Sequence, residues 1–370
     1  MSDTRKTTKP NVPNLRFPGF EGEWENKRIG DIGKFFSGGT PSSSRKDFYG
    51  GEIPFIRSGE IHSDKTELFL TQEGYKNSSA KMVEVGDILL ALYGANSGDI
   101  SISQMRGAIN QAILCIRTNV APVFFKSVWE KHAQKILNTY LQGGQGNLSA
   151  DIVKKITISI PSQIEQAKIA ALFSHLDERI SIQNKVIEKY ESLIKALAHE
   201  IIGKNAPNTM LSECVCCTSS TLKESDLSDA GAVPAYGAAG ISGFTDNALS
   251  AGDSLLITKD GSGVGSLRYV SGPHSFVGTM NSMTPRDGFY LPYIYYALHN
   301  VSFETYRTGQ AIPHIYFRDY GKERIFCPGY LDQKRIAIGL ERIESKMLIE
   351  RYFKEHLLSV KAYLLNALFI

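Results

Sequence analysis

The sequence predicts an α+β protein in which two β-rich globular units stand in tandem, each followed by a long helix. Two observations carry this prediction. Apolar residues recur at heptad spacing through residues 162–203 and again through 331–370, as in helices that pack against other helices. Elsewhere, short apolar runs separated by Gly, Pro and Ser indicate strands.

Length and composition indicate a soluble protein of two or three domains. The chain has 370 residues, of which 42% are hydrophobic and 21% charged. No apolar run approaches the roughly 20 residues of a membrane span, and the first residues lack the apolar core of a signal peptide. Five cysteines, an odd number, fit a reducing compartment. We therefore expect a cytoplasmic protein that does not contact a membrane.

The first unit is expected to cover residues 11–161, after a disordered polar tail at 1–10. A proline that suits the first position of a helix opens the one helix expected within this unit. Strands are expected at 53–57, 87–93, 112–117 and 155–160, and the helix from Pro122 to Gln142.

The first long helix is expected over residues 162–203. Ser162 and Glu165 have the spacing of a capping box, and Gly203 suits a left-handed C-cap. About 40 residues at 1.5 Å each make a rod of about 60 Å, which is too long for one domain. Only Gln183 interrupts its apolar seam, and a single polar position there can set the register.

The second half of the chain repeats the first. Four anchors recur at offsets of 165 to 167 residues, which predicts a second unit at 204–330 and a second long helix at 331–370. The simplest arrangement pairs the two helices as an antiparallel coiled coil with the units at opposite ends, although each helix could instead recruit another protein. The anchors are Gly86 with Gly252, Gly144-Gln145 with Gly309-Gln310, Pro161 with Pro328, and Gln166 with Gln333.

The sequence carries no motif of a catalytic or cofactor site. It lacks a phosphate-binding loop, a Pro-Pro dipeptide of the adenine methyltransferase motif, GxSxG and HExxH. The glycines at 261–265 lack the GxGxxG spacing and predict a hairpin loop. Cys214, Cys216 and Cys217 have no second Cys or His pair at metal-ligand spacing. We predict no catalytic residue, no metal and no cofactor bound by this chain.

Net charge argues against a DNA-binding protein that acts alone. The chain has a net charge of +3. Residues 11–161 carry 17 basic and 15 acidic side chains, and residues 205–330 carry 8 and 11. Neither segment has the strong basic excess of a solitary nucleic-acid binder.

Several motifs resemble the specificity (S) subunits of type I restriction–modification systems, over nearly the whole chain. They are LRFPGFEGEW, IPFIRSGEI, GDILLALYGANSG and GGQGNLS in the first half, and VPAYGAAGISGFTDNAL, GDSLLITKDGSGVGS and TGQAIPHIYFRD in the second. The resemblance implies two target-recognition domains, each reading half of a bipartite site in duplex DNA, and a coiled-coil spacer that sets the gap. It also implies two modification (methyltransferase) subunits that carry S-adenosylmethionine and methylate adenines, and restriction subunits that use ATP and Mg. Such partners can supply phosphate contacts that this chain lacks.

Polar loop residues are the candidate DNA contacts, because Arg, Lys, Asn and Gln read base edges or hold phosphates. Each could equally be a turn residue, and Asn110, between apolar neighbours, is the one most expected to be structural. The candidates are Ser42, Ser43, Arg45, Lys46, Arg57, Tyr93, Asn96, Asn110, Gln145 and Asn147 in the first unit, and Tyr236, Lys259, Ser262, Asn281, Arg307, Gln310 and His314 in the second. The alternative function is a non-catalytic coiled-coil adaptor whose units bind protein or glycan.

Overall fold

The structure is a computed structural model of the chain, and it describes residues 10–141, 147–309 and 312–370. The tail expected at 1–10 lies almost wholly outside the described residues. The chain divides into two compact units. The first unit comprises residues 1–182 and 354–370, and the second comprises residues 183–353. Each long helix therefore contributes residues to both units.

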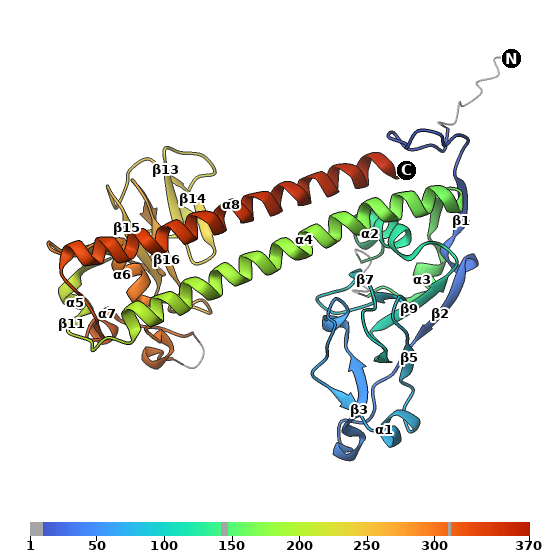
Figure 1. Cartoon of the computed structure of the whole chain (residues 1–370), viewed down its shortest axis with the longest axis horizontal. Coiled ribbons are helices and arrows are strands. Elements are labelled where there is room, and N and C mark those ends of the chain that lie inside the picture. Colours follow the sequence, from blue (N-terminus) through green and yellow to red (C-terminus); the bar gives the residue numbers. More distant parts are fainter. Residues whose placement is uncertain (1–9, 142–146, 310–311) are drawn as a thin grey trace. The chain divides into compact units, whose positions relative to one another are not determined.

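The first unit is built on two four-stranded sheets (Figure 1, blue to green). Their strand orders are β2-β9-β6-β7 and β4-β3-β8-β5, and β1 pairs with β10. All pairs are antiparallel except β3 with β8. The strands are β1 (Glu25–Arg28), β2 (Gly33–Ser37), β3 (Tyr49–Ile56), β4 (Phe69–Leu70), β5 (Lys81–Val83), β6 (Ile88–Ala91), β7 (Ile100–Ile102), β8 (Gly107–Ile109), β9 (Ile113–Thr118) and β10 (Thr157–Ile160). The helices are α1 (Gln72–Lys76), α2 (Pro122–Leu141), α3 (Ala150–Lys155) and the long α4 (Gln163–Ala198).

The second unit repeats this arrangement (Figure 1, yellow to orange). Its sheets have the orders β12-β18-β15-β16 and β14-β13-β17, and β11 pairs with β19. Here β13 and β17 are parallel, as β3 and β8 are in the first unit, which confirms the predicted repeat. The strands are β11 (Thr209–Met210), β12 (Val215–Ser219), β13 (Val233–Gly237), β14 (Gly240–Thr245), β15 (Ser254–Thr258), β16 (Leu267–Val270), β17 (Ser275–Phe276), β18 (Met280–Pro285) and β19 (Arg324–Ile325). The helices are α5 (Leu211–Cys214), α6 (Leu291–Leu298), α7 (Phe317–Tyr320) and the long α8 (Tyr330–Leu368).

The segment before β1 is anchored on α4 by an ion pair. Arg16 Nε and Nη2 each donate to a carboxylate oxygen of Glu165 at 2.8 Å. Ser162 Oγ accepts from the Glu165 N–H at 3.3 Å, so the cap forms. The Glu165 carboxylate, however, binds Arg16 and does not return to the Ser162 backbone. The predicted capping box is therefore only half correct. The bond from the Glu165 N–H to Ser162 forms, but the Glu165 carboxylate pairs with Arg16 and not with the Ser162 N–H.

The end of α4 differs from the prediction. The α-helix ends at Ala198, and a π-helical turn follows over His199–Gly203. Gly203 does not have a positive φ, so the predicted left-handed C-cap is wrong. A Cβ at Gly203 would lie 2.6 Å from Asn300 Oδ1, so a larger residue here would displace that side chain. Ile201, expected in the apolar seam, is 40% exposed.

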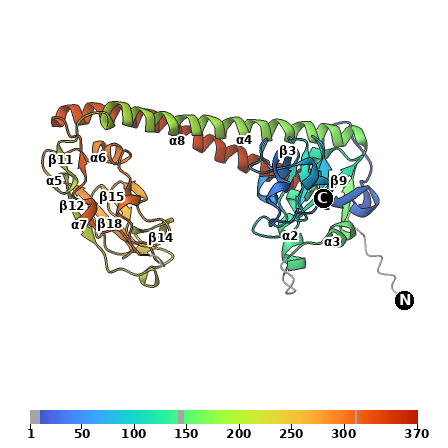
Figure 2. The same cartoon turned by 90° about the horizontal axis from the view of Figure 1, so that it is seen from below.

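Within each unit the two long helices contact one another. In the second unit, where Figures 1 and 2 both show the start of α8 beside the end of α4, Gln183 donates to the backbone oxygen of Glu350 at 3.1 Å and also to its carboxylate. In the first unit, Lys361 of α8 lies 2.8 Å from Asp177 of α4 and 2.9 Å from Glu130 of α2. The amide of buried Gln183 thus has hydrogen-bond partners on Glu350, which explains how a polar residue is accommodated on the apolar seam of α4.

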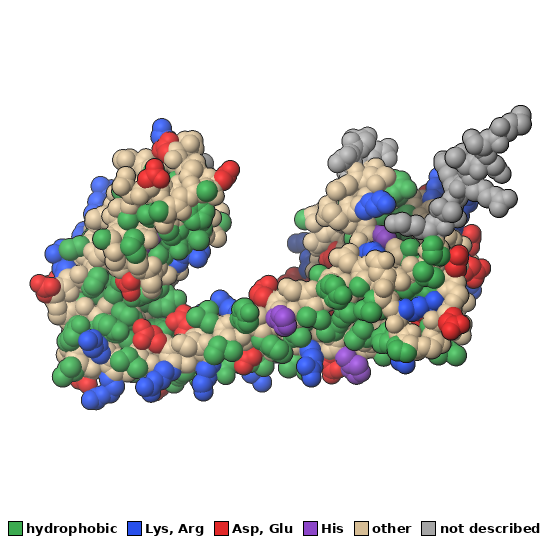
Figure 3. Space-filling view, turned by 90° about the horizontal axis from the view of Figure 1, so that it is seen from above, with side chains coloured by type: hydrophobic (Ala, Val, Ile, Leu, Met, Phe, Trp, Pro, Cys, Tyr) green, Lys and Arg blue, Asp and Glu red, His purple; other side chains and the backbone are tan. Residues whose placement is uncertain are grey.

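Charge is distributed without a dominant sign. On the face drawn in Figure 3, Lys and Arg side chains are interspersed with Asp and Glu. This agrees with the small net charge of +3. Among the helices that the structure describes, none combines the length and the apolar character needed to cross a membrane.

Candidate functional site

The structure brings the polar loops of the first unit together. The loop after β2 meets the β8–β9 turn, where the Gly38 N–H donates to the Asn110 oxygen at 3.2 Å. The loop after β3 meets the β6–β7 loop, where His62 Nε2 lies 2.9 Å from Asp99 Oδ2. The segment before α3 joins that loop through a backbone hydrogen bond from Leu148. Loops that are distant in sequence therefore form one polar cluster.

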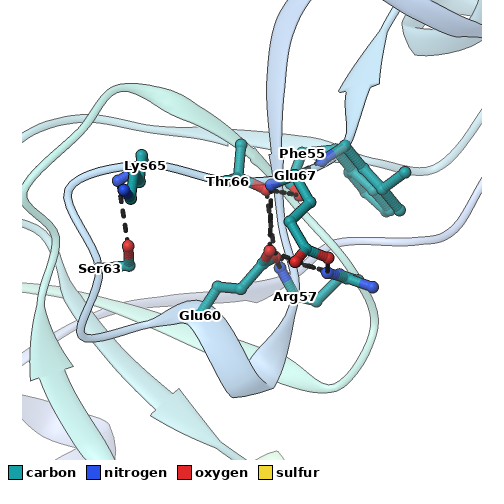
Figure 4. Close-up of polar contacts among 8 residues, drawn as sticks. Phe55, Arg57, Glu60, Ser63, Lys65, Thr66 and Glu67 are labelled. Atoms are coloured by element: carbon teal, nitrogen blue, oxygen red, sulfur yellow. Dashed lines mark hydrogen bonds and ion pairs between the residues drawn. The ribbon is translucent and has the colours of Figure 1, made fainter. Parts of the chain in front are cut away.

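Arg57 and Glu60 form a polar group in this cluster that is joined by several hydrogen bonds (Figure 4). Arg57 Nε and Nη2 donate to the two Glu60 oxygens at 3.1 and 2.9 Å, and Nη2 also donates to Glu67 at 2.8 Å. Glu60 further accepts from the N–H groups of Arg57 and Glu67 and from Thr66 Oγ1, at 3.1 to 3.2 Å. Glu60 is thus an anchor that fixes the guanidinium, while Arg57 Nη1 takes no part in these bonds.

Electrostatics make this group permanently charged near neutral pH. Burial alone would raise the pKa of Glu60, but hydrogen bonds from Arg57, the backbone and Thr66 lower that pKa to about 2. The same carboxylate and Glu67 raise the pKa of Arg57. The Glu67 side chain is 84% exposed, so solvent or a ligand can compete with it for the guanidinium.

The other candidates of the first unit divide into exposed residues and structural ones. Arg45 is exposed, pairs with Asp47 at 2.6 Å and lies over the Phe48 ring at 4.3 Å. Asn110 caps its own turn, since its Oδ1 accepts from the Ala112 N–H at 3.1 Å, in agreement with its expected structural role. Exposed are Ser42, Ser43, Lys46, Asn96 and Asn147; Tyr93 is half-buried, and Gln145 lies outside the described residues.

The loops of the second unit converge in the same way. The Val277 N–H donates to the Tyr236 oxygen at 2.9 Å, and the Lys259 N–H donates to the Thr279 oxygen at 2.9 Å. The Ile315 N–H donates to the Lys259 oxygen at 2.9 Å, as Leu148 does to Leu92 in the first unit. These bonds place the ends of β13, β15 and β17 and the segment before α7 side by side.

A stacked row of side chains stands at this second cluster. His314 Nδ1 lies 2.6 Å from Asp260 Oδ1, and its ring stacks on that of Tyr316 with centroids 6.5 Å apart. Arg318 in turn lies over the Tyr316 ring at 4.8 Å. Sequence reasoning selected only His314 from this row. The sequence His-Ile-Tyr-Phe-Arg at 314–318 alternates residues that have a polar group with purely apolar ones, and this is the signal that would have added the other two.

Among the remaining candidates of the second unit, Asn281 requires a correction. It is 4% exposed, and its amide is occupied by Ser219 Oγ at 2.7 Å and Tyr320 Oη at 3.2 Å. Its position on β18 turns it into the unit, so it does not face a ligand. Arg307 is exposed and pairs with Glu304 at 2.7 Å, Ser262 is exposed, Lys259 and Tyr236 are half-buried, and Gln310 lies outside the described residues.

Arg268 of β16 was also missed by sequence reasoning. It is exposed, and its guanidinium lies 6.0 Å from the centroid of the Tyr236 ring. In the part of the chain that the structure describes, no three His, Cys, Asp or Glu side chains gather as metal ligands would. The two clusters thus offer hydrogen-bond donors, cations and aromatic faces, which are the chemistry of recognition.

Sequence comparison places the first half of the chain in a known family. Residues 21–192 match the type I restriction modification DNA specificity domain. The chain is 29% identical over 184 residues to the MjaIX specificity subunit of Methanocaldococcus jannaschii, and 28% identical over 187 residues to the HindI specificity subunit of Haemophilus influenzae. These matches cover 45% and 46% of this chain, and only 41% and 40% of the relatives. The chain therefore matches less than half the length of these relatives.

Structural comparison extends over the whole chain. The S subunit of a type I restriction–modification system from M. genitalium superposes with a TM-score of 0.64 at 17% identity, covering 97% of this chain and 99% of that one. A chain from a structure of type I system assembly and conformational transition gives 0.50 at 17% identity, covering 96% and 98%. At these identities the likeness concerns the fold. The segment at residues 21–192 thus matches the type I restriction modification DNA specificity domain, and the whole chain shares the fold of the M. genitalium S subunit.

Proposed function

We propose that this chain is the DNA-reading subunit of a type I restriction–modification complex. Each unit contacts one half of a bipartite site in duplex DNA through its cluster of polar loops. The observation that carries this proposal is that two units whose larger sheets correspond strand for strand, β2-β9-β6-β7 and β12-β18-β15-β16, present different side chains at equivalent loop positions. A shared scaffold with different loops suits two readers of two different sequences.

Two pairs of equivalent positions illustrate the difference. The first unit has Leu92 and Asn147 where the second has Lys259 and His314, because the hydrogen bond from Leu148 to Leu92 corresponds to that from Ile315 to Lys259. An amide can bond bidentately to adenine, whereas a lysine and a histidine suit guanine or phosphate. The two half-sites should therefore differ in sequence.

The long helices serve as the spacer in this proposal. We infer that α4 and α8 pair as an antiparallel coiled coil. The two recognition domains cover residues 11–161 and 204–330, and the two long helical segments cover residues 162–203 and 331–370. The contacts Gln183–Glu350 and Asp177–Lys361 within the two units support it. Inserting one heptad into both helices should lengthen the gap between half-sites and leave the bases read unchanged. An unchanged gap in a folded, active protein would contradict the spacer role.

The chemistry belongs to partner subunits. Two modification subunits with S-adenosylmethionine methylate adenines, and restriction subunits use ATP and Mg. This chain, a cytoplasmic protein without catalysis of its own, directs both. Its small net charge fits this division, because the partners can supply contacts to phosphates. The alternative of an adaptor for protein or glycan has no support in the comparisons.

A domain exchange tests the proposal. Residues 27–160 are replaced by the corresponding unit of a relative, and methylated adenines are mapped by sequencing in cells that also express the partners. One half-site should change and the other should stay, and exchange of residues 204–330 should do the reverse. A change in both halves, or in neither, would contradict the two-reader function. In a mobility-shift assay, a failure of the chain to bind any DNA sequence selectively, both with and without the partner subunits, would contradict a DNA-reading function.

A further inference from the structure

Two thiols of the second unit face each other. Cys214 Sγ and Cys327 Sγ lie 3.7 Å apart, although 113 residues separate them in sequence. Cys214 is the last residue of α5 and is fully buried. Cys327 lies in the segment between β19 and α8 and is partly exposed. This separation is van der Waals contact, and a disulfide of about 2.05 Å needs a further approach of under 2 Å.

The backbones on both sides are held in place. The Asn208 side chain donates to the Cys327 oxygen at 2.9 Å and accepts from the Cys327 N–H at 2.8 Å. The Cys214 oxygen accepts from the Arg286 N–H at 2.9 Å. Because both main chains are pinned, the thiols meet through the fold and not through a mobile loop. Side-chain rotation is then the main movement that a bond between them requires.

The first unit shows that the fold itself does not need this pair. Cys214 immediately precedes β12, and Ile32 immediately precedes the equivalent β2. Cys327 precedes Pro328 as Ile160 precedes Pro161. Ile32 and Ile160 are both buried apolar residues. Two hydrocarbon side chains are therefore sufficient to pack these two positions of the fold. The second unit has thiols there, where the first unit has isoleucines.

We propose that Cys214 and Cys327 form a reversible disulfide that ties the start of β12 to the root of α8. Low-molecular-weight disulfides such as oxidised glutathione are the oxidants. Cys327 attacks one sulfur of the reagent, whose S–S bond breaks and releases one thiol. Cys214 then attacks the mixed disulfide at Cys327, loses its proton and releases the second thiol. The protein is oxidised by two electrons and the reagent is reduced to two thiols.

The environment assigns these two roles. The hydrogen bond between the two thiols lowers the pKa of Cys327, which favours the thiolate at the partly exposed sulfur. The same interaction, together with burial, raises the pKa of Cys214. The accessible thiolate therefore meets the reagent first, and the buried thiol resolves the intermediate.

Oxidation of the full chain by mixtures of reduced and oxidised glutathione tests the proposal. Remaining thiols are alkylated, and the chain is digested without reduction and mapped by mass spectrometry. We expect a cross-linked peptide that joins Cys214 to Cys327, and an unfolding temperature raised by about 5 °C or more. Reduction should reverse both changes.

Three variants complete the test. Cys327→Ser should abolish the cross-link, and Cys214→Ser should trap glutathione on Cys327. Cys216→Ser, at an exposed cysteine, should leave the cross-link intact. Separate alkylation of Cys214 and Cys327 in the oxidised wild-type chain would overturn the proposal, as would a cross-link between Cys216 and Cys217 alone. Because the peptide map of the wild-type chain needs no substitution, it tests the proposed disulfide even if a variant does not fold.

Discussion

Gln166 and Gln333 make the same pair of hydrogen bonds in the two units. Each amide nitrogen donates at 2.9 Å to the backbone oxygen of the proline five residues before it, Pro161 or Pro328. Each amide oxygen accepts from the N–H just before a shorter helix, Ala121 at 3.2 Å and Tyr290 at 2.9 Å. Both glutamines are at most 5% exposed. One side chain therefore joins the long helix of each unit to the helix packed beside it.

Replacement of Gln166 by Ala should destabilise the first unit. The substitution leaves the Pro161 oxygen and the Ala121 N–H without partners in a buried place, which costs about 2 kcal/mol or more. Urea unfolding followed by circular dichroism measures this loss. Gln163→Ala, on an exposed face of the same helix, should change stability by less than about 0.5 kcal/mol. Equal effects of the two variants would show that the buried amide has no special role.

Glu67→Gln should strengthen DNA binding if the proposed function holds. Glu67 competes with phosphate or base for the Arg57 guanidinium, and the glutamine removes its charge while Glu60 still fixes the arginine. We expect affinity of the assembled complex to rise a few-fold, and Arg57→Ala to lower it about tenfold or more. Mobility shift on a methylation site measures both.

A matched control for this pair is Arg106→Ala. Arg106 also forms an exposed ion pair, with Glu84 at 3.1 Å, but it stands outside the predicted contact loops. Its removal should leave affinity within about twofold, since exposed ion pairs contribute little. If Arg106→Ala weakened binding as much as Arg57→Ala, the effect of Arg57 would come from nonspecific charge attraction and not from a specific DNA contact.

Stability of the first unit should depend on acid pH through Glu60. Its folded pKa of about 2 lies below the usual 4.5, so its charged form favours the folded state at every pH above about 4.5. This contribution, about 2 kcal/mol after discounting for the partly exposed Arg57, is lost as the pH falls from about 4.5 towards 2. Unfolding free energies of wild type and Glu60→Gln should therefore converge over that window. A difference that stays constant from pH 6 to pH 2.5 would refute the assignment.

Phe369→Ala should destabilise the first unit by about 3 kcal/mol or more. Phe369 is 2% exposed, and its ring lies 5.4 to 6.3 Å from those of Trp24, Phe124 and Phe173. Thermal unfolding measures the loss. Phe353→Ala removes the same kind of side chain from α8, at a position that is 42% exposed, and it should cost under 1 kcal/mol. Similar losses in the two variants would rule out the aromatic cluster as the cause.

Much of the fold could be predicted from local patterns. The strands expected at 87–93 and 112–117 are β6 and β9, and the helix expected from Pro122 is α2. The Gly-rich stretch at 261–265 joins the antiparallel strands β15 and β16, as a hairpin loop would. These features depend on hydrophobic period and turn residues, which neighbours along the chain determine.

The state of single site residues could not be predicted in the same way. Asn281 reads as a polar loop residue, yet its strand register turns it inward against Ser219 and Tyr320. Arg57 reads as a free cation, yet Glu60 and Glu67 hold it. A side chain's neighbours across a sheet or between loops belong to chain segments far away in sequence. They cannot be predicted from the residues next to it along the chain.

The sequence by itself determined that this protein is a tandem repeat of β-rich units with long helices, because repeats and heptads are written in residue order. Tertiary structure alone decided which loops form each cluster, which polar residues are buried, and which ends of α4 and α8 complete each core. It also placed Cys214 beside Cys327, across 113 residues. The physical reason is that contacts of this kind arise only when strand pairing and packing have fixed the register of distant segments.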